Sequence, residues 1–316
     1  MGSDLDEFVD AAVDFVHGGK RLRPLFCRAG WLVTGGDPDD PRLDRAAAAL
    51  EWLQGSALVH DDLMDGSDTR RGRPSVHRDF ERKHREAAMV GDPARHGASV
   101  AVLLGDLMLS WADEQFRSSG LPRTTEALRF LDLCKTEVVA GQYLDVLAQT
   151  RPSVGVEEAM RVVRYKSAKY TVERPLHLGA ALAGADDTLI AALTDIALPL
   201  GEAFQLRDDV LGVFGDPDVT GKPAGDDLRE GKRTVLVARA AELGTDADRE
   251  LLARGLGTQA AVDELRDLVE RTGALAAVEA DIARLEREAD AALDALPPGG
   301  RELLEPLLLT ATRRSR

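Results

Sequence analysis

The most informative stretch of this sequence is RAAAALEWLQGSALVHDDLMD, residues 45–65. It opens with a run of alanines, the residue with the highest helix propensity. The positions that follow one another at helical intervals of three or four residues are Leu50, Leu53, Ala57 and Asp61. The stretch therefore predicts one long helix over Arg45–Asp65 that is largely apolar and becomes acidic at its C-terminal end.

Similar helical patterns follow along the chain, separated by short polar connections. They cover Ser99–Phe116, Thr124–Gln149, Val156–Leu182, Thr188–Val213 and Val262–Leu296, the last of them broken near Gly273. Alternation of polar and apolar residues over strand lengths is hard to find, so the fold class is all-α. No shift in composition marks a domain boundary, and we expect a single domain over residues 1–316.

Two polar connections stand out between these helical patterns. The first is Lys83–Gly97, which contains a Gly-Asp-Pro turn signal. The second, Gly215–Arg233, is rich in Gly, Asp and Lys, which is typical either of a solvated loop or of a flap that carries cations toward a ligand.

The composition excludes some classes of protein. A hydrophobic content of 44% is globular, and a formal net charge of -15 disfavours nonspecific binding to nucleic acid. The two cysteines, Cys27 and Cys134, lack metal-type spacing and are expected to be reduced, buried thiols of a cytoplasmic protein. We find no secretion signal and no run approaching about 18 apolar residues, so we predict no membrane span.

Two clusters of aspartates lie at the ends of apolar helical patterns. In HDDLMD (60–65), Asp61 and Asp65 are one helical turn apart and repel each other, and a hard divalent cation would offset that repulsion. RDDVLG (207–212) repeats the Asp-Asp pair as Asp208 and Asp209. Either cluster alone could be a solvated helix end, but the two together predict facing walls of one cavity that binds Mg²⁺.

Zinc is disfavoured because no cluster of Cys and His accompanies these carboxylates, and His60 is more typical of a structural residue than of a ligand.

Basic residues occur near the aspartates and elsewhere in small groups. Arg side chains match diphosphate oxygens in pairs and Lys side chains act as point charges, so the groups predict two diphosphate sites. The groups are Lys20 with Arg23, Arg70 with Arg71, Lys166 with Lys169, and Lys222 with Lys232 and Arg233.

These motifs resemble the trans-isoprenyl diphosphate synthase (polyprenyl synthetase) family, and geranylgeranyl diphosphate synthases in particular. GGKRLRP (18–24), HDDLMD with the following RRG, KSAKYT (166–171), QLRDD (205–209) and the GK…GKR loop occur in the family's order and rough spacing. The resemblance implies a single large antiparallel helix bundle around a central cavity, usually a homodimer.

The resemblance also assigns roles to individual residues. Asp61, Asp65 and Asp208, supported by Asp62 and Asp209, would hold several Mg²⁺ ions. The allylic diphosphate would be bound by Arg70, Lys166, Ser167, Gln205, Lys222 and Lys232, and isopentenyl diphosphate by Lys20, Arg23 and Arg71. Within these sets, the catalytic residues would be Asp61, Asp65, Asp208, Arg70, Lys166 and Lys222.

Three positions depart from the family pattern. Gln54 stands among the isopentenyl diphosphate ligands where the family often has His, and it cannot carry charge. Gly212 ends the second motif where a third Asp is common, which leaves fewer carboxylates there. Gly18 begins its motif nearer to the start of the sequence than is usual, as in a trimmed chain or a short variant.

The implied reaction needs no protein nucleophile. Mg²⁺ and the cations neutralise the diphosphate that leaves the allylic carbon, and the double bond of isopentenyl diphosphate attacks that carbon.

The family limits product length with a bulky aromatic one turn before the first Asp. Here small residues stand at that place, so we expect a C20 product, geranylgeranyl diphosphate, from a dimethylallyl, geranyl or farnesyl starter. The positions expected to shape the tunnel are Ser56, Ala57, Leu53, Leu50 and Trp52.

Other functions are compatible with these residues. The product could be farnesyl diphosphate or longer than C20. A terpene cyclase would share the cavity, but it would not need Lys20, Arg23 and Arg71. A non-catalytic regulatory subunit would fit the departures at Gln54 and Gly212, but not the retained aspartates.

Overall fold

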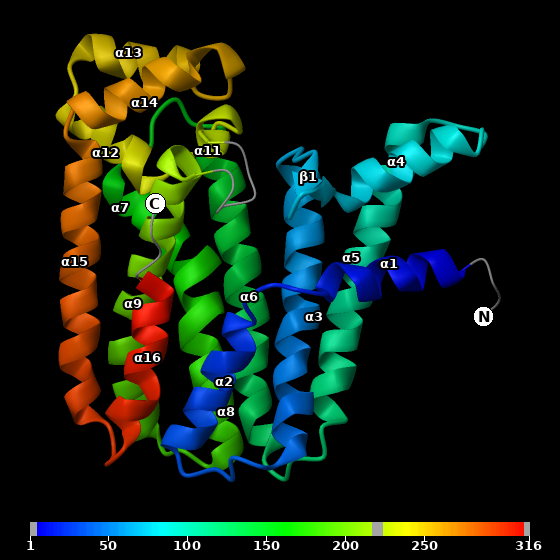
Figure 1. Ribbon diagram of the computed structural model, residues 1–316, viewed down its shortest axis with the longest axis vertical. Coiled ribbons are helices and arrows are strands. Elements are labelled where there is room, and N and C mark those ends of the chain that lie inside the picture. The colour runs from blue at the N-terminus through cyan, green and yellow to red at the C-terminus, as the bar shows by residue number, and fades with distance from the viewer. Residues whose placement is uncertain (1–4, 217–223, 313–316) are drawn as a thin grey trace. The chain divides into compact units, whose positions relative to one another are not determined.

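The computed structural model describes residues 5–216 and 224–312 (Figure 1). Most of these residues are helical, which confirms the all-α prediction. Within the described ranges, the strands are limited to a short antiparallel hairpin of β1 (Thr69–Arg70) and β2 (Arg73–Pro74). The chain forms two compact units, Met1–Leu25 with Asp39–Thr124, and Phe26–Pro38 with Thr125–Arg316. The prediction of a single domain stays a prediction.

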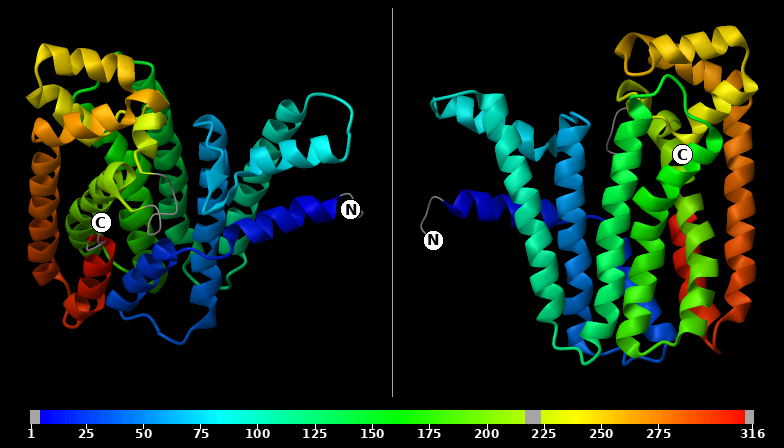
Figure 2. Two further views of the ribbon diagram at one scale, coloured as in Figure 1. Left: turned by 45° about the horizontal axis from the view of Figure 1, so that its top comes forward. Right: turned by 180° about the vertical axis from the view of Figure 1, so that it is seen from behind.

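The first unit is built around two long helices that lie side by side in all the views (Figures 1 and 2). They pack on each other through a small apolar core that includes Val59, Leu104 and Met108. The helices of this unit are α1 (Asp6–Val16), α3 (Pro41–Met64), α4 (Val76–Glu86) and α5 (Pro93–Arg117).

Both long helices begin earlier than predicted, because each starts at an Asp-Pro pair. Asp40 accepts a hydrogen bond from the backbone N–H of Arg42, and Asp92 accepts one from that of Ala94. Proline fits the first helical turn, where its missing N–H has no partner to lose. The Gly-Asp-Pro signal is therefore a helix start, and the connection predicted over Lys83–Gly97 is wrong, since helices occupy most of that range.

The second unit contains the remaining helices, several of which run alongside one another while α13 and α14 lie across one end (Figure 1). The predicted break at Gly273 separates α14 from α15. The helices are α2 (Leu22–Val33), whose first residues belong to the first unit, α6 (Thr124–Gln149), α7 (Val156–Val162), the π-helical η2 (Val163–Glu173), α8 (Arg174–Ala183), α9 (Asp187–Phe214), α11 (Asp226–Arg229), α12 (Val235–Leu243), α13 (Asp246–Gly255), η3 (Gln259–Ala261), α14 (Val262–Arg271), α15 (Ala274–Ala292), η4 (Leu293–Ala295) and α16 (Gly300–Thr312).

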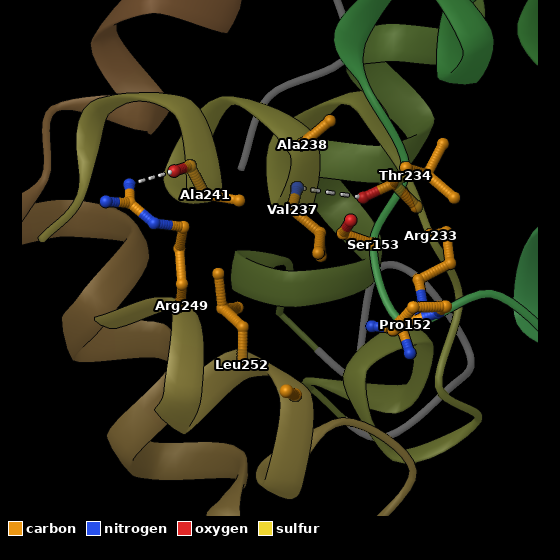
Figure 3. Close-up of a pocket in the computed structure, with 11 residues that line it drawn as sticks. Pro152, Ser153, Arg233, Thr234, Val237, Ala238, Ala241, Arg249 and Leu252 are labelled. Carbon is orange, nitrogen blue, oxygen red and sulfur yellow. Dashed lines mark hydrogen bonds between the residues drawn. The ribbon is translucent and has the colours of Figure 1, made fainter. Parts of the chain in front are cut away.

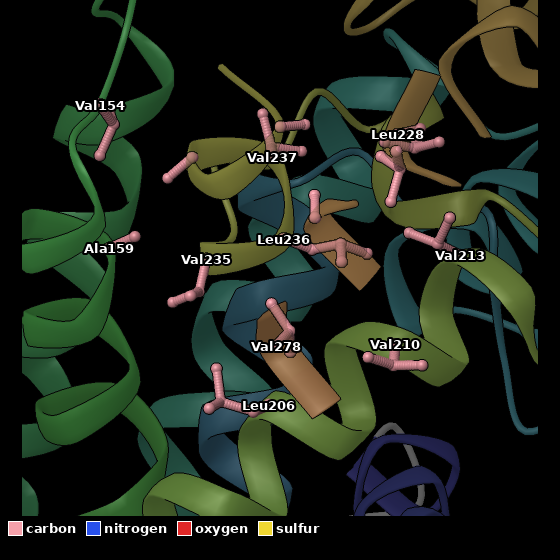
Figure 4. Close-up of a cluster of buried hydrophobic side chains, with 14 of the residues drawn as sticks. Val154, Ala159, Leu206, Val210, Val213, Leu228, Val235, Leu236, Val237 and Val278 are labelled. Atoms are coloured by element: carbon pink, nitrogen blue, oxygen red, sulfur yellow. The ribbon is translucent and has the colours of Figure 1, made fainter. Parts of the chain in front are cut away.

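The core of the second unit gathers on one side of α9. Figure 4 shows Leu206, Val210 and Val213 of this helix directed toward side chains such as Leu236 and Val278. All five of these residues are fully buried. The acidic motif of α9 is thus carried by a helix that packing holds in place.

Helix α9 is long and apolar enough, with a mean hydropathy of 1.4 over its most apolar window, to cross a membrane on length and composition alone. Core helices of water-soluble proteins meet the same criterion, and 44% of this window is buried. In the structure α9 packs against η2 and α15.

The two cysteines are buried and free, as predicted. Burial raises the pKa of the Cys27 thiol to about 12, so this side chain is a neutral part of the core.

Candidate active site

The first acidic cluster lies at the C-terminal end of α3. Asp65 is the last residue of the helical turn, and its backbone N–H donates to the carbonyl of Asp61 at 2.8 Å. Asp61 is partly exposed, whereas Asp62 is 1% exposed. Asp61 and Asp65 are therefore one turn apart, as predicted, and the carboxylate between them points into the protein.

Arg70 of the β-hairpin folds back onto this cluster. Its Nε donates to Asp62 Oδ1 at 2.9 Å, and its Nη2 donates to the same oxygen. Nη2 also lies 3.8 Å from Asp61 Oδ2. The sequence placed Arg70 near the aspartates but did not show that Asp62 would be its main partner.

Arg71 belongs to a group of cations in the same unit. Its backbone is left-handed, with φ of 53°, and its Nη1 donates to the His17 carbonyl at 3.3 Å. Burial lowers the pKa of Arg71, the charge of Glu51 opposes this, and Arg70, Arg21 and Arg23 lower it further. These electrostatic neighbours bring together Arg23 and Arg71, two of the residues predicted to bind isopentenyl diphosphate.

Arg21 belongs to this group and was missed by the sequence analysis. It forms an ion pair with Glu51 of α3 and, like Arg71, adopts a φ of 53°. Its place between Lys20 and Arg23 was the available signal. Lys20 itself is exposed, just before α2 begins.

The residues predicted to shape the tunnel lie on α3 before the aspartates. Leu53 and Ser56 are buried, while Gln54 and Ala57 are partly buried. Trp52 packs edge-on against Trp111 of α5, with ring centroids 5.0 Å apart, so its ring belongs to the core of the first unit. The last positions are Leu50, which is fully buried, and His60, whose Nε2 lies 3.1 Å from the Val102 carbonyl, as expected of a structural residue.

The second acidic cluster lies near the C-terminal end of α9. Asp208 is exposed, whereas Asp209 is buried and accepts a hydrogen bond from Gln205 Nε2 at 2.8 Å. Burial raises the pKa of Asp209 well above its usual value, the charges of Asp227 and Asp208 add to this, and the Gln205 bond opposes it. Gln205, predicted to bind substrate, thus also holds the buried aspartate of its own motif.

Asp227 of α11 was missed by the sequence analysis. Its Oδ1 lies 3.5 Å from Nζ of Lys232, which is also 2.6 Å from Glu230 Oε2. The run Asp226-Asp227 inside the predicted Gly215–Arg233 connection was the only signal. Lys222, predicted to bind the allylic diphosphate, lies outside the described residues.

Lys166 and Ser167 lie on η2, whose π-helical turns are wider than those of an α-helix. Such turns occur frequently at functional sites. Lys166 Nζ lies 2.5 Å from Asp145 Oδ2 of α6, another partner that the sequence analysis missed. Lys169 pairs with Glu137, at 3.1 Å, and with Glu173. Lys169 therefore pairs with two carboxylates that Arg174 also contacts, and Lys166 pairs with Asp145.

Across the described ranges 5–216 and 224–312, no three or more His, Cys, Asp or Glu side chains are grouped as a metal site. The carboxylates that the sequence assigned to Mg²⁺ are divided between the two units, Asp61, Asp62 and Asp65 in one, and Asp208 and Asp209 in the other.

A small pocket of about 70 Å³ lies in the second unit beside the start of α12 (Figure 3). Its wall is mostly apolar and includes Val154, Val237 and Leu252. Arg249 lies at its edge and donates to the Ala241 carbonyl at 3.0 Å. Arg233, from one of the predicted basic groups, is among the lining residues, but none of the aspartates predicted to bind Mg²⁺ is, so the candidate active site is not this pocket.

Known proteins match almost the whole chain. The model of the polyprenyl synthetase family matches residues 5–272. A geranylgeranyl diphosphate synthase of Saccharolobus solfataricus is 34% identical over 79% of this chain and 71% of its own. A geranylfarnesyl diphosphate synthase of Natronomonas pharaonis is 34% identical over 73% of this chain and 67% of its own.

A solved structure is similar over nearly the same length. Geranylgeranyl pyrophosphate synthase from Corynebacterium glutamicum, complexed with isoprenyl diphosphate and magnesium, superposes with a TM-score of 0.93 at 42% identity, covering 99% of this chain and 92% of that one. The acidic clusters, the arginines beside them and the all-α fold therefore have a common explanation, and this chain belongs to the polyprenyl synthetase family.

Proposed function

We propose that the protein condenses isopentenyl diphosphate with an allylic diphosphate, head to tail, to give geranylgeranyl diphosphate. The observation that carries the proposal is the pairing at the end of α3, where an acidic cluster stands beside Arg70 and the group around Arg71. Carboxylates and arginines side by side suit a diphosphate that is bound partly through metal and partly directly.

The donor chemistry fits Mg²⁺. Asp61 and Asp208 keep carboxylates that are accessible to solvent, while Asp62 and Asp209 are buried and engaged by Arg70 and Gln205. We therefore assign metal binding to Asp61, Asp65 and Asp208, with Asp62 and Asp209 in support. When bound, several Mg²⁺ ions would neutralise the diphosphate that departs.

The remaining roles belong to the cations and polar groups of the chain. Arg70 Nη2 lies 3.8 Å from Asp61 Oδ2, so a diphosphate held through metal at Asp61 would be within reach of Arg70. Lys166, Ser167, Gln205, Lys222 and Lys232 would bind the same group, and Lys20, Arg23, Gln54 and Arg71 would bind isopentenyl diphosphate. Positioning the two substrates is the main contribution, since the attacking double bond needs no protein nucleophile.

The product length rests on α3. Ser56 and Ala57 are small, and Leu53 lies one turn further from Asp61, so a tunnel along this helix would leave room for a chain longer than C15. The relatives named above include synthases named for C20 and for longer products at the same sequence identity. The proposal of a C20 product therefore rests on the tunnel residues alone.

A homodimer and a cytoplasmic location complete the proposal. Helix α6 exposes Val139, Tyr143 and Val146 at helical intervals, with 67%, 66% and 39% of their surfaces accessible, and a second copy of the chain would cover this stripe. Sedimentation of the purified protein at micromolar concentration tests it, and a monomer would overturn the dimer.

The direct test is incubation of the purified protein with Mg²⁺, isopentenyl diphosphate and each allylic starter, with products identified by mass spectrometry. We expect a C20 diphosphate, and no product after chelation of the metal.

Asp61→Ala should remove most turnover with an unchanged circular dichroism spectrum, and Ser56→Phe should shorten the product. An unchanged product length would refute the tunnel assignment.

The same incubation separates the rival functions. A terpene cyclase would convert an allylic diphosphate alone into a hydrocarbon or alcohol. A regulatory subunit would give no product by itself, whatever the starter.

A further inference from the structure

Gly212, near the C-terminal end of α9, is a glycine inside a helix. A glycine there costs roughly 1 kcal/mol relative to alanine, so a structural reason for it is expected. A Cβ placed on Gly212 would lie 2.1 Å from Oδ2 and 2.7 Å from Cγ of Asp227. The carboxylate of Asp227 therefore occupies the space into which a side chain at position 212 would project.

Two further contacts hold Asp227 in this position. The backbone N–H of Gly225 donates to the carbonyl of Gly212 at 3.0 Å, which joins the start of α11 to the end of α9. Leu228, the residue after Asp227, is fully buried in the core of the second unit, as Figure 4 shows. The contacts of Gly225 and Leu228, on either side of Asp227, therefore hold Asp227 against α9.

Asp227 also contacts Lys232 through both its backbone and its side chain. The backbone N–H of Lys232 donates to the Asp227 carbonyl at 3.0 Å, and Nζ lies 3.5 Å from Oδ1. Only 18% of the Lys232 side chain and 16% of the Asp227 side chain are accessible. The attraction between them is therefore screened less than that of a surface pair.

We propose that Asp227 supplies, from α11, the carboxylate that the second acidic motif lacks at Gly212, and that it positions Lys232. The glycine is then not a loss from the motif but the recess that accepts Asp227. The positioning of Lys232 for a diphosphate rests on the proposed function, whereas the steric fit of Asp227 to Gly212 does not.

The steric fit is tested by a double-mutant cycle in the absence of substrate. Gly212→Ala should destabilise the protein by displacing Asp227, whereas in Gly212→Ala/Asp227→Ala the obstructing carboxylate is gone. Introduced alone, the alanine at position 212 should raise the unfolding equilibrium constant. Introduced together with Asp227→Ala, it should raise that constant by a factor at least ten times smaller, as measured by urea denaturation.

Gly155 provides the matched control, because nothing lies within 4 Å of a Cβ placed there. Gly155→Ala should combine additively with Asp227→Ala. If Gly212→Ala is also additive with Asp227→Ala, the recess does not exist and the inference is overturned, whether or not the protein makes a prenyl diphosphate.

The positioning of Lys232 is tested with Asp227→Asn, which keeps the shape of the side chain and removes its charge. We expect the KM for the allylic diphosphate to rise about tenfold, the KM for isopentenyl diphosphate to stay within twofold, and the affinity for Mg²⁺ with inorganic pyrophosphate, measured by calorimetry, to fall in parallel. Equal changes in both KM values, or no change in either, would remove the positioning role. An inactive wild-type protein would instead contradict the proposed function and leave the cycle at Gly212 intact.

Discussion

Arg70 is the side chain on which the first acidic cluster most depends. Two of its nitrogens donate to one oxygen of Asp62, which is 1% exposed. Removing one partner of a buried ion pair leaves a charge with less compensation, at a cost of about 3 kcal/mol. We therefore expect Arg70→Ala to lower the free energy of unfolding by about that amount, as measured by urea denaturation, and to slow turnover as well.

Arg73 is the matched control on the same hairpin, because it is exposed on β2. Arg73→Ala should change the free energy of unfolding by less than about 0.5 kcal/mol. If both variants unfold at the same urea concentration, the pair of Arg70 with Asp62 contributes nothing measurable and this account of the cluster is wrong.

The sequence predicted that Arg70 and the aspartates would be neighbours, because a short turn after a helix cannot carry the chain far. It could not show which of Asp61 and Asp62 would pair with Arg70, because the direction of each carboxylate depends on how α3 packs. It also missed Asp145 and Asp227, the partners of Lys166 and Lys232. Such contacts join distant parts of the chain and leave no local pattern.

The π-helical segment η2 is the element that most distinguishes the second unit. Its backbone approaches α6 and α9 at glycines. A Cβ on Gly141 would lie 2.2 Å from the backbone nitrogen of Lys166, and a Cβ on Gly201 would lie 2.7 Å from Cα of Ala168. These two glycines permit the close packing of η2 against α6 and α9, and Lys166 pairs with Asp145 of α6.

We expect Gly141→Ala to push η2 away from α6 and to cost about 1–3 kcal/mol of stability, the usual range for overpacking. The pairing of Lys166 with Asp145 should weaken as well, so the KM for the allylic substrate should rise. Ala140→Ser, which adds an atom at an exposed position of the same helix, is the control. A Gly141→Ala protein with the thermal midpoint and KM of the wild type would show that the close approach is not needed.

The helical pattern over Val156–Leu182 predicted one helix, and the structure divides that range into α7, η2 and α8. The prediction of helix was right, but periodicity gave no sign of the wider turns. A π-helix has no residue signature of its own and arises where tertiary packing favours it. The glycines of the flanking helices were visible in the sequence, but their partners were not.

For the molecule as a whole, the all-α class and most of the long helices were predictable, because each buries a broad apolar face with the period of a helix. Helix starts were predicted less well, although Asp40-Pro41 and Asp92-Pro93 are strong start signals. Several shorter helices were not predicted, among them α1, α4, α12, α13 and α16, since their patterns are too brief to stand out.

Global stability should depend on pH through His177, a buried residue that joins three helices of the second unit. Arg174 can only donate, so its contact with His177 Nδ1 at 3.1 Å makes Nδ1 the acceptor. Nε2 then carries the proton and donates to Thr194 Oγ1, at 3.1 Å. The ring also packs against Phe130 of α6. This arrangement holds a neutral imidazole.

Burial, followed by the charges of Arg174 and Lys169, lowers the pKa of His177 from 6.5 to about 3. Between these values the unfolded chain binds a proton that the folded protein does not, so the free energy of unfolding should fall as the pH falls below 6.5, by about 1.4 kcal/mol per pH unit. His177→Gln keeps a donor and an acceptor but does not titrate. Urea denaturation at pH 7, 6 and 5 should therefore give a shallower decline for the variant, because all other titrating groups are shared. Parallel curves for the two proteins would mean that His177 is protonated in the fold as readily as in the unfolded chain, against the packing that surrounds it.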